Sequence, residues 1–496
     1  MLDSLKIEAN KTWTENGALT HLTSGSDCVD LFATIGALRH REDSEIVRRF
    51  MRAYAEDPDV AMKILFFARD IRGGLGERRV FRTVLRHLAV YAPASVVRNL
   101  PLVAEYGRWD DLLVLLDTPC AADALAVLRR QFDDDMAALK SGGQVSLLGK
   151  WLPSVNASNG DTVRDAKRVA RAFGLTDAAY RKSLTALRAR IRLLENDLRL
   201  EDYTFDYARQ PSRAMFKYRH AFLRNDQERY LDFMGRAERG EAKLHADTLL
   251  PYEIVAPCLY DGGVWHDHCY MKPLSDGEKQ ALNATWASLP DFTGGENALA
   301  VVDTSGSMYC QSHPVPAAVA LSLGLYFAER NKGVFGNHFI EFSATPQLIE
   351  VKGETFADRL RYVASFNEVA NTDLQAVFRL ILNAAVKHSV PPEELPARLY
   401  LISDMEFDAC TRGADLTNFQ YARQLFESHG YKLPQVVFWN VASRRRQQPV
   451  TINDRGVALV SGCSPRIFAQ VMEGELDPYG FMMRVVGAER YAAIAA

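Results

Sequence analysis

Side chains with hard oxygen donors gather in three short segments of the last two hundred residues. The first is Asp303-Thr304-Ser305-Gly306-Ser307, which directly follows an apolar run. Alternate spacing allows the acid and both serines to lie on one side of an extended turn, and Gly306 eases the backbone there. Carboxylate and hydroxyl oxygens are ligands that Mg²⁺ prefers, while it keeps several waters or a ligand oxygen in its octahedron. The sequence therefore predicts a Mg²⁺ or Mn²⁺ site whose ligands are Asp303, Ser305, Ser307, Thr372 and Asp404.

Strands alternating with helices are predicted from residue 297 onward, and they place these ligands. The expected strands are 297–303, 337–342, 397–404, 434–441 and 456–462, and the expected helices are 315–330, 372–388 and 419–431. This alternation favours βαβ units and a mostly parallel sheet. Ligands of such sheets bind beyond the carboxyl ends of the strands, where Asp303 and Asp404 lie. Thr372 opens a predicted helix in a nearby loop.

The preceding 290 residues have the pattern of many short helices. Apolar residues recur there at three- and four-residue spacing, and clusters of Gly, Pro, Asn or Asp such as residues 73–76 separate the segments. Successive short helices favour a HEAT-like stack of helix pairs, although no clean sequence repeat is present. The predicted fold class is thus α plus α/β. A HEAT-like helical-repeat domain spans residues 1–290, and a Rossmann-like domain spans residues 296–496.

Composition excludes several classes of protein. With 496 residues the chain is too long for a single core, and it contains 48% hydrophobic and 24% charged residues, as globular proteins do. No apolar run reaches the roughly 18–20 residues of a membrane span, and the first residues lack the apolar core of a signal peptide. Seven scattered cysteines suit reduced thiols better than a disulfide framework. We expect a cytoplasmic protein without a membrane partner.

Basic residues are concentrated in two bands, although the net charge is −3. Residues 63–98 contain eight bases against two acids, and residues 164–229 hold a second excess. The arginine guanidinium suits phosphate groups. Proteins hold single-stranded RNA through basic side chains combined with aromatic side chains on which the RNA bases stack, and Lys150-Trp151 offers such a pair. The predicted RNA contacts are Arg69, Arg72, Arg78, Arg79, Arg82, Lys150, Arg213, Lys217 and Arg219. The competing interpretation is a set of solvated helix faces with core aromatics.

The five candidate metal ligands resemble the metal-ion-dependent adhesion site of von Willebrand A domains. That site combines an Asp-x-Ser-x-Ser loop with a Thr from a second loop and an Asp from a third, which the residues of this chain match in order. The resemblance implies a site that is usually not catalytic, in which the metal offers a coordination position to an acidic group of a partner. The alternative is that Asp303 and the serines merely cap a helix.

A helical half followed by such a domain resembles the Ro ribonucleoprotein (TROVE) family, in which HEAT-like repeats close into a ring. At the level of motifs the chain is similar to a Ro-like family of bacteria, eukaryotes and viruses. The shared stretches include residues 14–20, 69–82, 106–113, 211–218, 401–408 and 459–465. The resemblance implies an RNA-binding scaffold in RNA quality control, which takes small structured RNAs or single-stranded RNA ends.

Two alternatives to an RNA scaffold remain. In the first, the domain is a metal-dependent protein interaction module without RNA, and a partner supplies a Glu or Asp to the metal. The second is a nuclease-like role, because the carboxylates Glu406 and Asp408 follow Asp404 closely. We expect no enzyme, because no Gly-x-Ser-x-Gly elbow surrounds Ser305.

Overall fold

The computed structural model describes residues 1–260, 270–309, 314–343, 345–366, 372–408, 416–472 and 474–496. The chain forms two compact units. Unit 1 comprises residues 1–41 and 207–488, and unit 2 comprises residues 42–206 and 489–496. The bounds of these units differ from the predicted division at residues 290–296. That division was based on the change from helices alone to alternating strands and helices.

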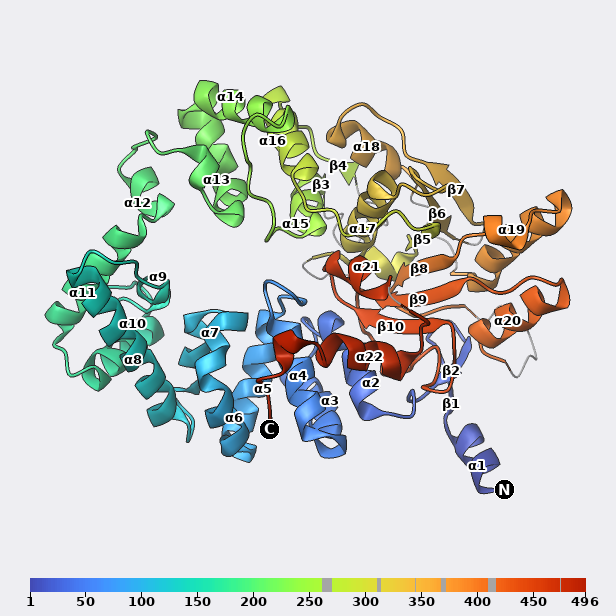
Figure 1. The fold of residues 1–496 in the computed structure, drawn as a ribbon, viewed down its shortest axis with the longest axis horizontal. Helices are drawn as coiled ribbons and strands as arrows, with labels where there is room; N and C mark the ends of the chain where they lie inside the picture. Colours follow the sequence, from blue (N-terminus) through green and yellow to red (C-terminus); the bar gives the residue numbers. More distant parts are fainter. Residues whose placement is uncertain (261–269, 310–313, 344, 367–371, 409–415, 473) are drawn as a thin grey trace. The chain divides into compact units, whose positions relative to one another are not determined.

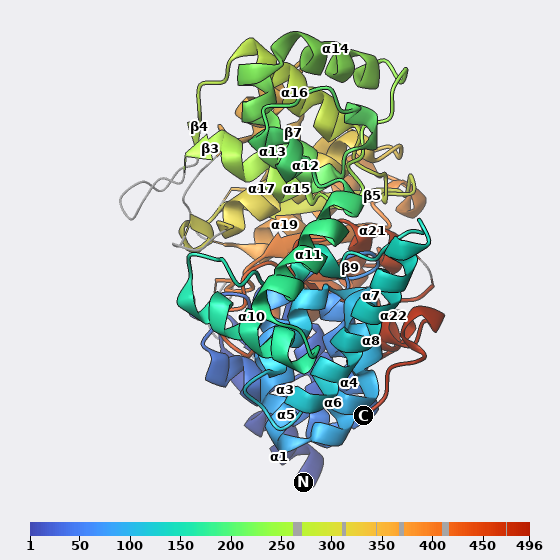
Figure 2. The ribbon, with the colours of Figure 1, turned by 90° about the vertical axis from the view of Figure 1, so that its left-hand side faces the viewer.

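Unit 2 is helical throughout the residues described. Its elements are α3 (Asp43–Glu56), α4 (Pro58–Arg69), α5 (Arg78–Tyr91), α6 (Pro93–Asn99), η2 (Leu100–Leu102), α7 (Val103–Tyr106), η3 (Trp109–Leu115), α8 (Ala121–Lys140), α9 (Leu148–Trp151), α10 (Gly160–Ala172), α11 (Asp177–Ile191), α12 (Leu194–Arg199) and η9 (Glu489–Tyr491). Neighbouring helices pack in turn, as α3 does on α4 and α5, and as α8 does on α10 and α11 (Figure 2). In α5, Val80, Phe81, Val84 and Leu88 are buried, so one apolar stripe faces the core.

The last residues of the chain complete unit 2. Asp70, at the end of α4, is fully buried and accepts hydrogen bonds from the Arg490 guanidinium and from the Tyr491 hydroxyl, the latter at 3.1 Å. The Asn99 side-chain amide donates to the Ala495 carbonyl at 2.6 Å. Residues 489–496 are thus bound to the helices α4 and α6 across about four hundred residues of sequence.

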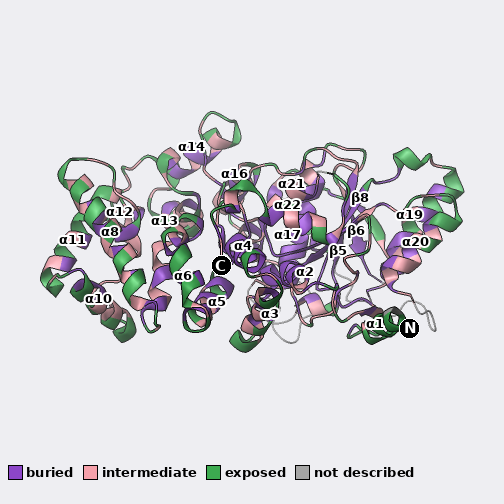
Figure 3. Cartoon of the chain, turned by 60° about the horizontal axis from the view of Figure 1, so that its bottom comes forward, coloured by how far each residue is buried: buried purple, intermediate pink, exposed green. Residues whose placement is uncertain are grey.

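A six-stranded sheet forms the centre of unit 1 (Figure 1). Its strands are β5 (Ala298–Asp303), β6 (His338–Phe342), β7 (Gln347–Glu350), β8 (Arg398–Ser403), β9 (Gln435–Asn440) and β10 (Val457–Ser461). The order is β10-β9-β8-β5-β6-β7, and only β7 is antiparallel to its neighbour. Numbered from β5, this is the 3-2-1-4-5-6 order of doubly wound α/β folds. All residues of β5, β8 and β10 are buried, as Figure 3 shows for the sheet.

Helices and short elements surround this sheet. The remaining elements of unit 1 are α1 (Leu2–Ala9), β1 (Lys11–Trp13), β2 (Leu19–His21), α2 (Asp27–Phe32), η1 (Ile35–Ala37), η4 (Tyr207–Arg209), α13 (Ser212–Asn225), α14 (Gln227–Glu238), α15 (Pro251–Val255), η5 (Ala256–Cys258), β3 (Leu259–Tyr260), β4 (Tyr270–Met271), α16 (Asp276–Ala287), η7 (Gly306–Tyr309), α17 (Pro316–Arg330), α18 (Phe356–Val363), α19 (Leu374–His388), η8 (Pro392–Glu394), α20 (Asn418–Ser428), α21 (Arg466–Val471) and α22 (Pro478–Val486). The apolar helix α17 packs on β5, β6 and β8, while α2 and α22 pack on β10.

Residues before the predicted boundary belong to the core of the sheet unit. Gly36 donates its backbone N–H to the Ser461 hydroxyl at 3.0 Å, and a Cβ at Gly36 would lie 2.7 Å from the Ser461 backbone. Trp286 of α16 stacks on Phe356 and donates to Glu329 of α17 at 2.6 Å. The predicted cut near residue 290 therefore passes through one packed core. Sequence periodicity marks elements, whereas contacts between distant segments decide which elements share a core.

Most elements expected from the sequence are present near their predicted bounds. The helix expected at 372–388 begins two residues later, because Asp373 is its N-cap and accepts from the Ala376 N–H. The strands β1 and β2, in a segment predicted to be helical, were not expected. Among the described residues no helix is both long and apolar enough to cross a membrane. The four cysteines in the described part of the chain, Cys28, Cys120, Cys258 and Cys463, are buried.

Candidate metal centre

Two neighbouring parallel strands bring Asp303 and Asp404 to one edge of the sheet. Asp303 is the last residue of β5, and Asp404 directly follows β8, with Val302 paired to Ile402 in the register. The Ser403 hydroxyl donates to Asp303 Oδ2 at 2.5 Å and so joins the two strand ends. Both carboxylates are buried. The sheet topology thus provides the juxtaposition that the sequence predicts.

The loop after β5 directs its serine hydroxyls toward one another. Asp303 Oδ1 accepts the Ser305 N–H at 2.9 Å, which closes a tight turn. Thr304 donates its hydroxyl to buried Glu341 of β6 at 2.7 Å, so the intervening residue anchors the loop. The oxygens Ser305 Oγ and Ser307 Oγ lie 3.1 Å apart. Ser305 and Ser307 thus lie together while Thr304 between them points to β6, as the predicted alternate spacing requires.

Thr372 lies against the loop that follows β8. Its hydroxyl donates to the Glu406 carbonyl at 3.2 Å, and its own carbonyl accepts the Asp408 N–H at 3.1 Å. Within this loop Asp404 Oδ1 accepts the Glu406 N–H at 3.2 Å. Met405 has a φ of 67°, a left-handed conformation that costs a bulky residue about 1–2 kcal/mol. These hydrogen bonds join Thr372 to the loop that begins with Asp404.

The two carboxylates are electrostatically unfavourable without a cation. Burial, followed by the charge of Asp404, raises the pKa of Asp303 to about 7. Burial also raises the pKa of Asp404, against the hydrogen bond from Ser307 and the charge of Arg444. Asp404 Oδ2 is buried and has no hydrogen-bond partner within the described part of the chain, although Arg444 Nη1 lies 3.6 Å away. A buried oxygen of this kind fits a position that a metal ligand would occupy.

The donor set suits a hard divalent cation. Two carboxylates and three hydroxyls supply only oxygen, which favours Mg²⁺ or Mn²⁺ over zinc. Among the residues described, no group of three or more His, Cys, Asp or Glu side chains could hold a metal. The candidate centre therefore depends on its hydroxyl oxygens, and waters would complete the octahedron.

The N-terminal segment also lies at this centre, which sequence reasoning did not predict. The Glu15 N–H donates to Glu406 Oε2 at 2.7 Å, and the Asn16 side-chain amide lies 3.4 Å from Thr372 Oγ1. The Glu15 carboxylate forms an ion pair with Arg444 at 2.7 Å. Residues 14–20 had been noted only as a stretch shared with the Ro-like family. No spacing rule connects a residue near the N-terminus with a loop four hundred residues later.

Glu406, one of the two acids on which the nuclease-like alternative rests, accepts hydrogen bonds through both carboxylate oxygens. Glu406 Oε1 accepts the Gln447 side-chain amide at 2.7 Å, and Glu406 Oε2 accepts the Glu15 N–H. Glu406 is 1% exposed. Both of its oxygens therefore bind neighbouring parts of the protein.

The predicted RNA contacts in unit 2 divide into buried and exposed groups. Arg69 is only 1% exposed and forms an ion pair with buried Asp111 at 2.7 Å, so the prediction that it contacts RNA is wrong. Arg82 is half-buried and pairs with Asp110 and Asp111 at 2.7 and 2.6 Å. Both arginines serve the packing between α4, α5 and η3. In contrast, the sequence-predicted contacts Arg72, Arg78 and Arg79 are exposed.

The remaining basic residues that were predicted to contact RNA lie beside aromatic rings or acidic side chains. In unit 2, Arg108 and Lys150 both lie over the partly exposed ring of Trp151, at 4.3 and 5.6 Å from its centre. In unit 1, Lys217 lies 4.7 Å from the Tyr218 ring and Arg219 lies 4.2 Å from the Phe216 ring. Arg213 is exposed and forms an ion pair with Glu253 at 3.1 Å. The pairing of Lys150 with Trp151 expected from the sequence is thus present.

Comparison with known proteins identifies relatives of undetermined role. Residues 297–480 match the family model "Domain of unknown function (DUF7788)", and residues 14–128 and 161–291 match "Domain of unknown function (DUF2828)". The chain is also similar to "Uncharacterized protein L728" of Acanthamoeba polyphaga mimivirus. The two are 28% identical over 520 residues, which cover 96% of this chain and 87% of the viral protein. The matched segments include both the candidate metal ligands and the N-terminal residues that lie against them.

Proposed function

We propose that unit 1 contains a von Willebrand A-type domain, which binds one Mg²⁺ or Mn²⁺ through Asp303, Ser305, Ser307, Thr372 and Asp404. The metal would offer a coordination position to an acidic group of a partner. This is a binding site and not a catalytic one. The support comes from the residues themselves: they gather at the carboxyl edge of a doubly wound sheet, where such folds bind ligands.

One observation carries the proposal. Two carboxylates, on Asp303 and Asp404, are buried side by side, and one oxygen of Asp404 has no hydrogen bond among the described residues. The negative charge of each carboxylate disfavours ionisation of the other, and a divalent cation would compensate both charges. The helix-cap alternative explains less, because Asp303 lies at the end of a buried strand and Ser403 and Ser305 already use its oxygens.

A calorimetric titration with Mn²⁺ tests the metal site. Asp303→Asn keeps the size of the side chain but removes a charge, and we expect Mn²⁺ affinity to fall by at least about 100-fold, as loss of one charged ligand does. Ser305→Ala should weaken binding by about tenfold through the loss of one neutral ligand.

Ser322→Ala is the matched control for the serine variant, because Ser322 is a buried serine of α17 that donates to its own helix at Val319. It should leave Mn²⁺ affinity unchanged. Equal affinities for the wild-type protein and Asp303→Asn would refute the site.

A second candidate function is RNA binding in the manner of Ro-like scaffolds. The observation that favours it is the ring of Trp151, which is partly exposed and has the cations of both Arg108 and Lys150 close to it. Aromatic side chains next to basic side chains commonly bind single-stranded nucleic acid, because its bases stack on the rings. The exposed arginines Arg78 and Arg79 of α5 would add contacts to phosphate. The alternative, in which unit 1 binds a protein partner and no RNA takes part, rests on the metal centre alone.

A further inference from the structure

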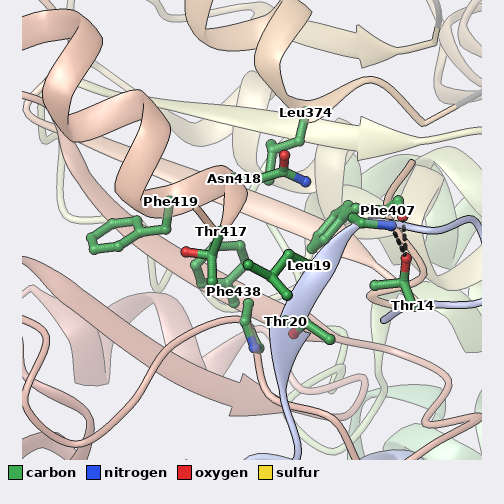
Figure 4. Close-up of a pocket in the computed structure, with 11 residues that line it drawn as sticks. Thr14, Leu19, Thr20, Leu374, Phe407, Thr417, Asn418, Phe419 and Phe438 are labelled. Atoms are coloured by element: carbon green, nitrogen blue, oxygen red, sulfur yellow. Dashed lines mark hydrogen bonds between the residues drawn. The ribbon is translucent and has the colours of Figure 1, made fainter. Parts of the chain in front are cut away.

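A small hairpin places N-terminal residues on the loop that follows β8. The strands β1 and β2 pair from Lys11–His21 to Trp13–Leu19, and residues 14–18 form the connection. The Thr14 hydroxyl donates to the Phe407 carbonyl at 2.5 Å (Figure 4), and Gly17 forms an antiparallel bridge with Asp408. The hairpin connection is therefore bound to the loop that contains Asp404.

This hairpin is also held from its second strand. His21 and Gln448 exchange backbone hydrogen bonds at 3.1 and 2.8 Å, and the Thr20 hydroxyl donates to the Gln448 carbonyl at 2.7 Å. The segment that contains Gln448 also carries Arg444. The hairpin thus connects the loop after β8 with the segment after β9, and both segments belong to unit 1.

Arg444 bridges the hairpin and the metal centre. Its Nη2 lies 2.7 Å from Glu15 Oε2, and its Nη1 lies 3.6 Å from Asp404 Oδ2. The latter oxygen is the one that has no hydrogen bond among the residues described. The guanidinium is thus the nearest described cation to the carboxylate oxygen that the metal would use.

A divalent ion bound to Asp404 would repel a guanidinium at this distance. Both cations compete for one buried carboxylate, and the repulsion between them is weakly screened away from water. Arg444 has a second acceptor in Glu15, whose side chain is 41% exposed and can follow the guanidinium outward. Glu406 does not serve as this acceptor, because Gln447 and the Glu15 N–H already bind its oxygens.

We propose that Arg444 is an internal cation that competes with the metal for Asp404, and that Glu15 is the acceptor that draws Arg444 away when the metal binds. This inference rests on the proposed metal site. Metal entry would then move Arg444 fully onto Glu15, so the N-terminal hairpin senses occupancy of the site. Glu15 acts through Arg444 and is a positioning residue, not a metal ligand.

A double-mutant cycle with Mn²⁺ as the probe tests the pair in the full-length protein. Arg444→Met removes the competing charge, and we expect Mn²⁺ affinity to rise by about tenfold. Glu15→Gln leaves Arg444 with Asp404 as its ion-pair partner, so affinity should fall by about three- to tenfold. In the Arg444→Met background, Glu15→Gln should change affinity by less than about twofold, since its effect passes through Arg444.

Matched controls separate this coupling from changes in total charge. Glu8→Gln, in α1, and Arg361→Met, at an exposed position of α18, alter the same charges away from the site, and both should leave affinity unchanged. Arg444→Lys keeps the charge and should resemble the wild-type protein more than Arg444→Met does. Arg444→Gln also removes the charge and replaces Arg444→Met in the test if the latter does not fold, which thermal unfolding would reveal.

The outcomes distinguish the two proposals. If neither the wild-type protein nor any of the variants binds Mn²⁺, the proposed metal site is wrong. Mn²⁺ binding that is lost in Asp303→Asn but unaffected by Arg444→Met overturns the Arg444 proposal alone. Equal effects of Glu15→Gln in both backgrounds would also overturn it. Amide hydrogen exchange of residues 11–21 gives a second readout: we expect Mn²⁺ to change protection there in the wild-type protein and not in Arg444→Met.

Discussion

Asp303 carries the largest electrostatic cost of the metal-free site. It is fully buried, and both burial and the neighbouring Asp404 favour its protonated form, with a pKa raised to about 7 from 3.8. Burial also raises the pKa of Asp404 and Glu406. Above pH 4 these carboxyl groups therefore bind more protons in the folded protein than in the unfolded chain, and their contribution to stability falls as pH rises through the raised pKa values.

The first residue-scale prediction is that metal-free protein becomes less stable from pH 4 to pH 7. With a chelator present, the free energy of unfolding should fall by up to about 4 kcal/mol over this interval, because the buried carboxylates must ionise. Thermal or urea unfolding at several pH values measures it. Asp303→Asn should flatten most of the dependence. A wild-type stability that rises steadily over the same range, with Asp303→Asn identical, would contradict the assignment.

The positions of the candidate metal ligands could be predicted from sequence because each one follows or precedes a recognisable element. Asp303 and Asp404 end apolar strands, and the order of strands places them together. Arg444 and Glu15 could not be predicted in the same way. Arg444 is one of three consecutive arginines, residues 444–446, and nothing in their spacing distinguishes the one that reaches Asp404. Side-chain direction in an irregular segment depends on packing that only the folded structure provides.

At the scale of elements, buried strands were easier to predict than half-exposed or short ones. The strands β5, β8 and β10 are continuous apolar runs because both faces are covered. The edge strand β7 has one buried residue among four, and β1 and β2 have three residues each. Such short segments carry too little periodicity to be distinguished from loops. The hairpin that contacts the loop after β8 is made of two such short strands.

The element-scale prediction concerns residues 489–496, which pack on the helices of unit 2. Arg490→Met would leave Asp70 buried with its main cationic partner removed, although Tyr491 and the Arg72 N–H would still donate to it. We expect a loss of about 2–3 kcal/mol in the free energy of unfolding, as for a broken buried pair with remaining hydrogen bonds. Urea unfolding measures this loss.

The matched control for Arg490 is Arg164→Met in α10, where the arginine is exposed and pairs with exposed Asp161. Its effect should stay within about 0.5 kcal/mol, as for surface ion pairs. Equal losses for both variants would mean that the C-terminal segment contributes nothing specific to unit 2.

At the scale of the whole molecule, the sequence predicted the two classes of structure but not the compact units. Residues 1–41 and 207–291 pack with the sheet, and residues 489–496 pack with the helices of unit 2. Contacts such as Gly36 with Ser461 and Asp70 with Arg490 join segments that lie more than four hundred residues apart. A single sequence contains no local signal for such pairs. Charge patterning also overestimated the basic surface, because Arg69 faces the interior.

The whole-molecule prediction is that RNA binding, if it occurs through the exposed bases of unit 2, depends on phosphate contacts. The probe is a single-stranded RNA of mixed sequence, titrated at several salt concentrations. Replacing Arg72, Arg78 and Arg79 with Glu should weaken binding for all sequences alike. It should also reduce the slope of log K against log salt by roughly 2, because three phosphate contacts are lost. The control replaces the exposed bases Lys352, Arg361 and Lys387 of unit 1 with Glu, which changes the total charge equally. If both triple variants lose affinity equally, only the net charge matters. If the wild-type protein binds no RNA while a partner is recovered that chelation releases, the interaction-module alternative is correct.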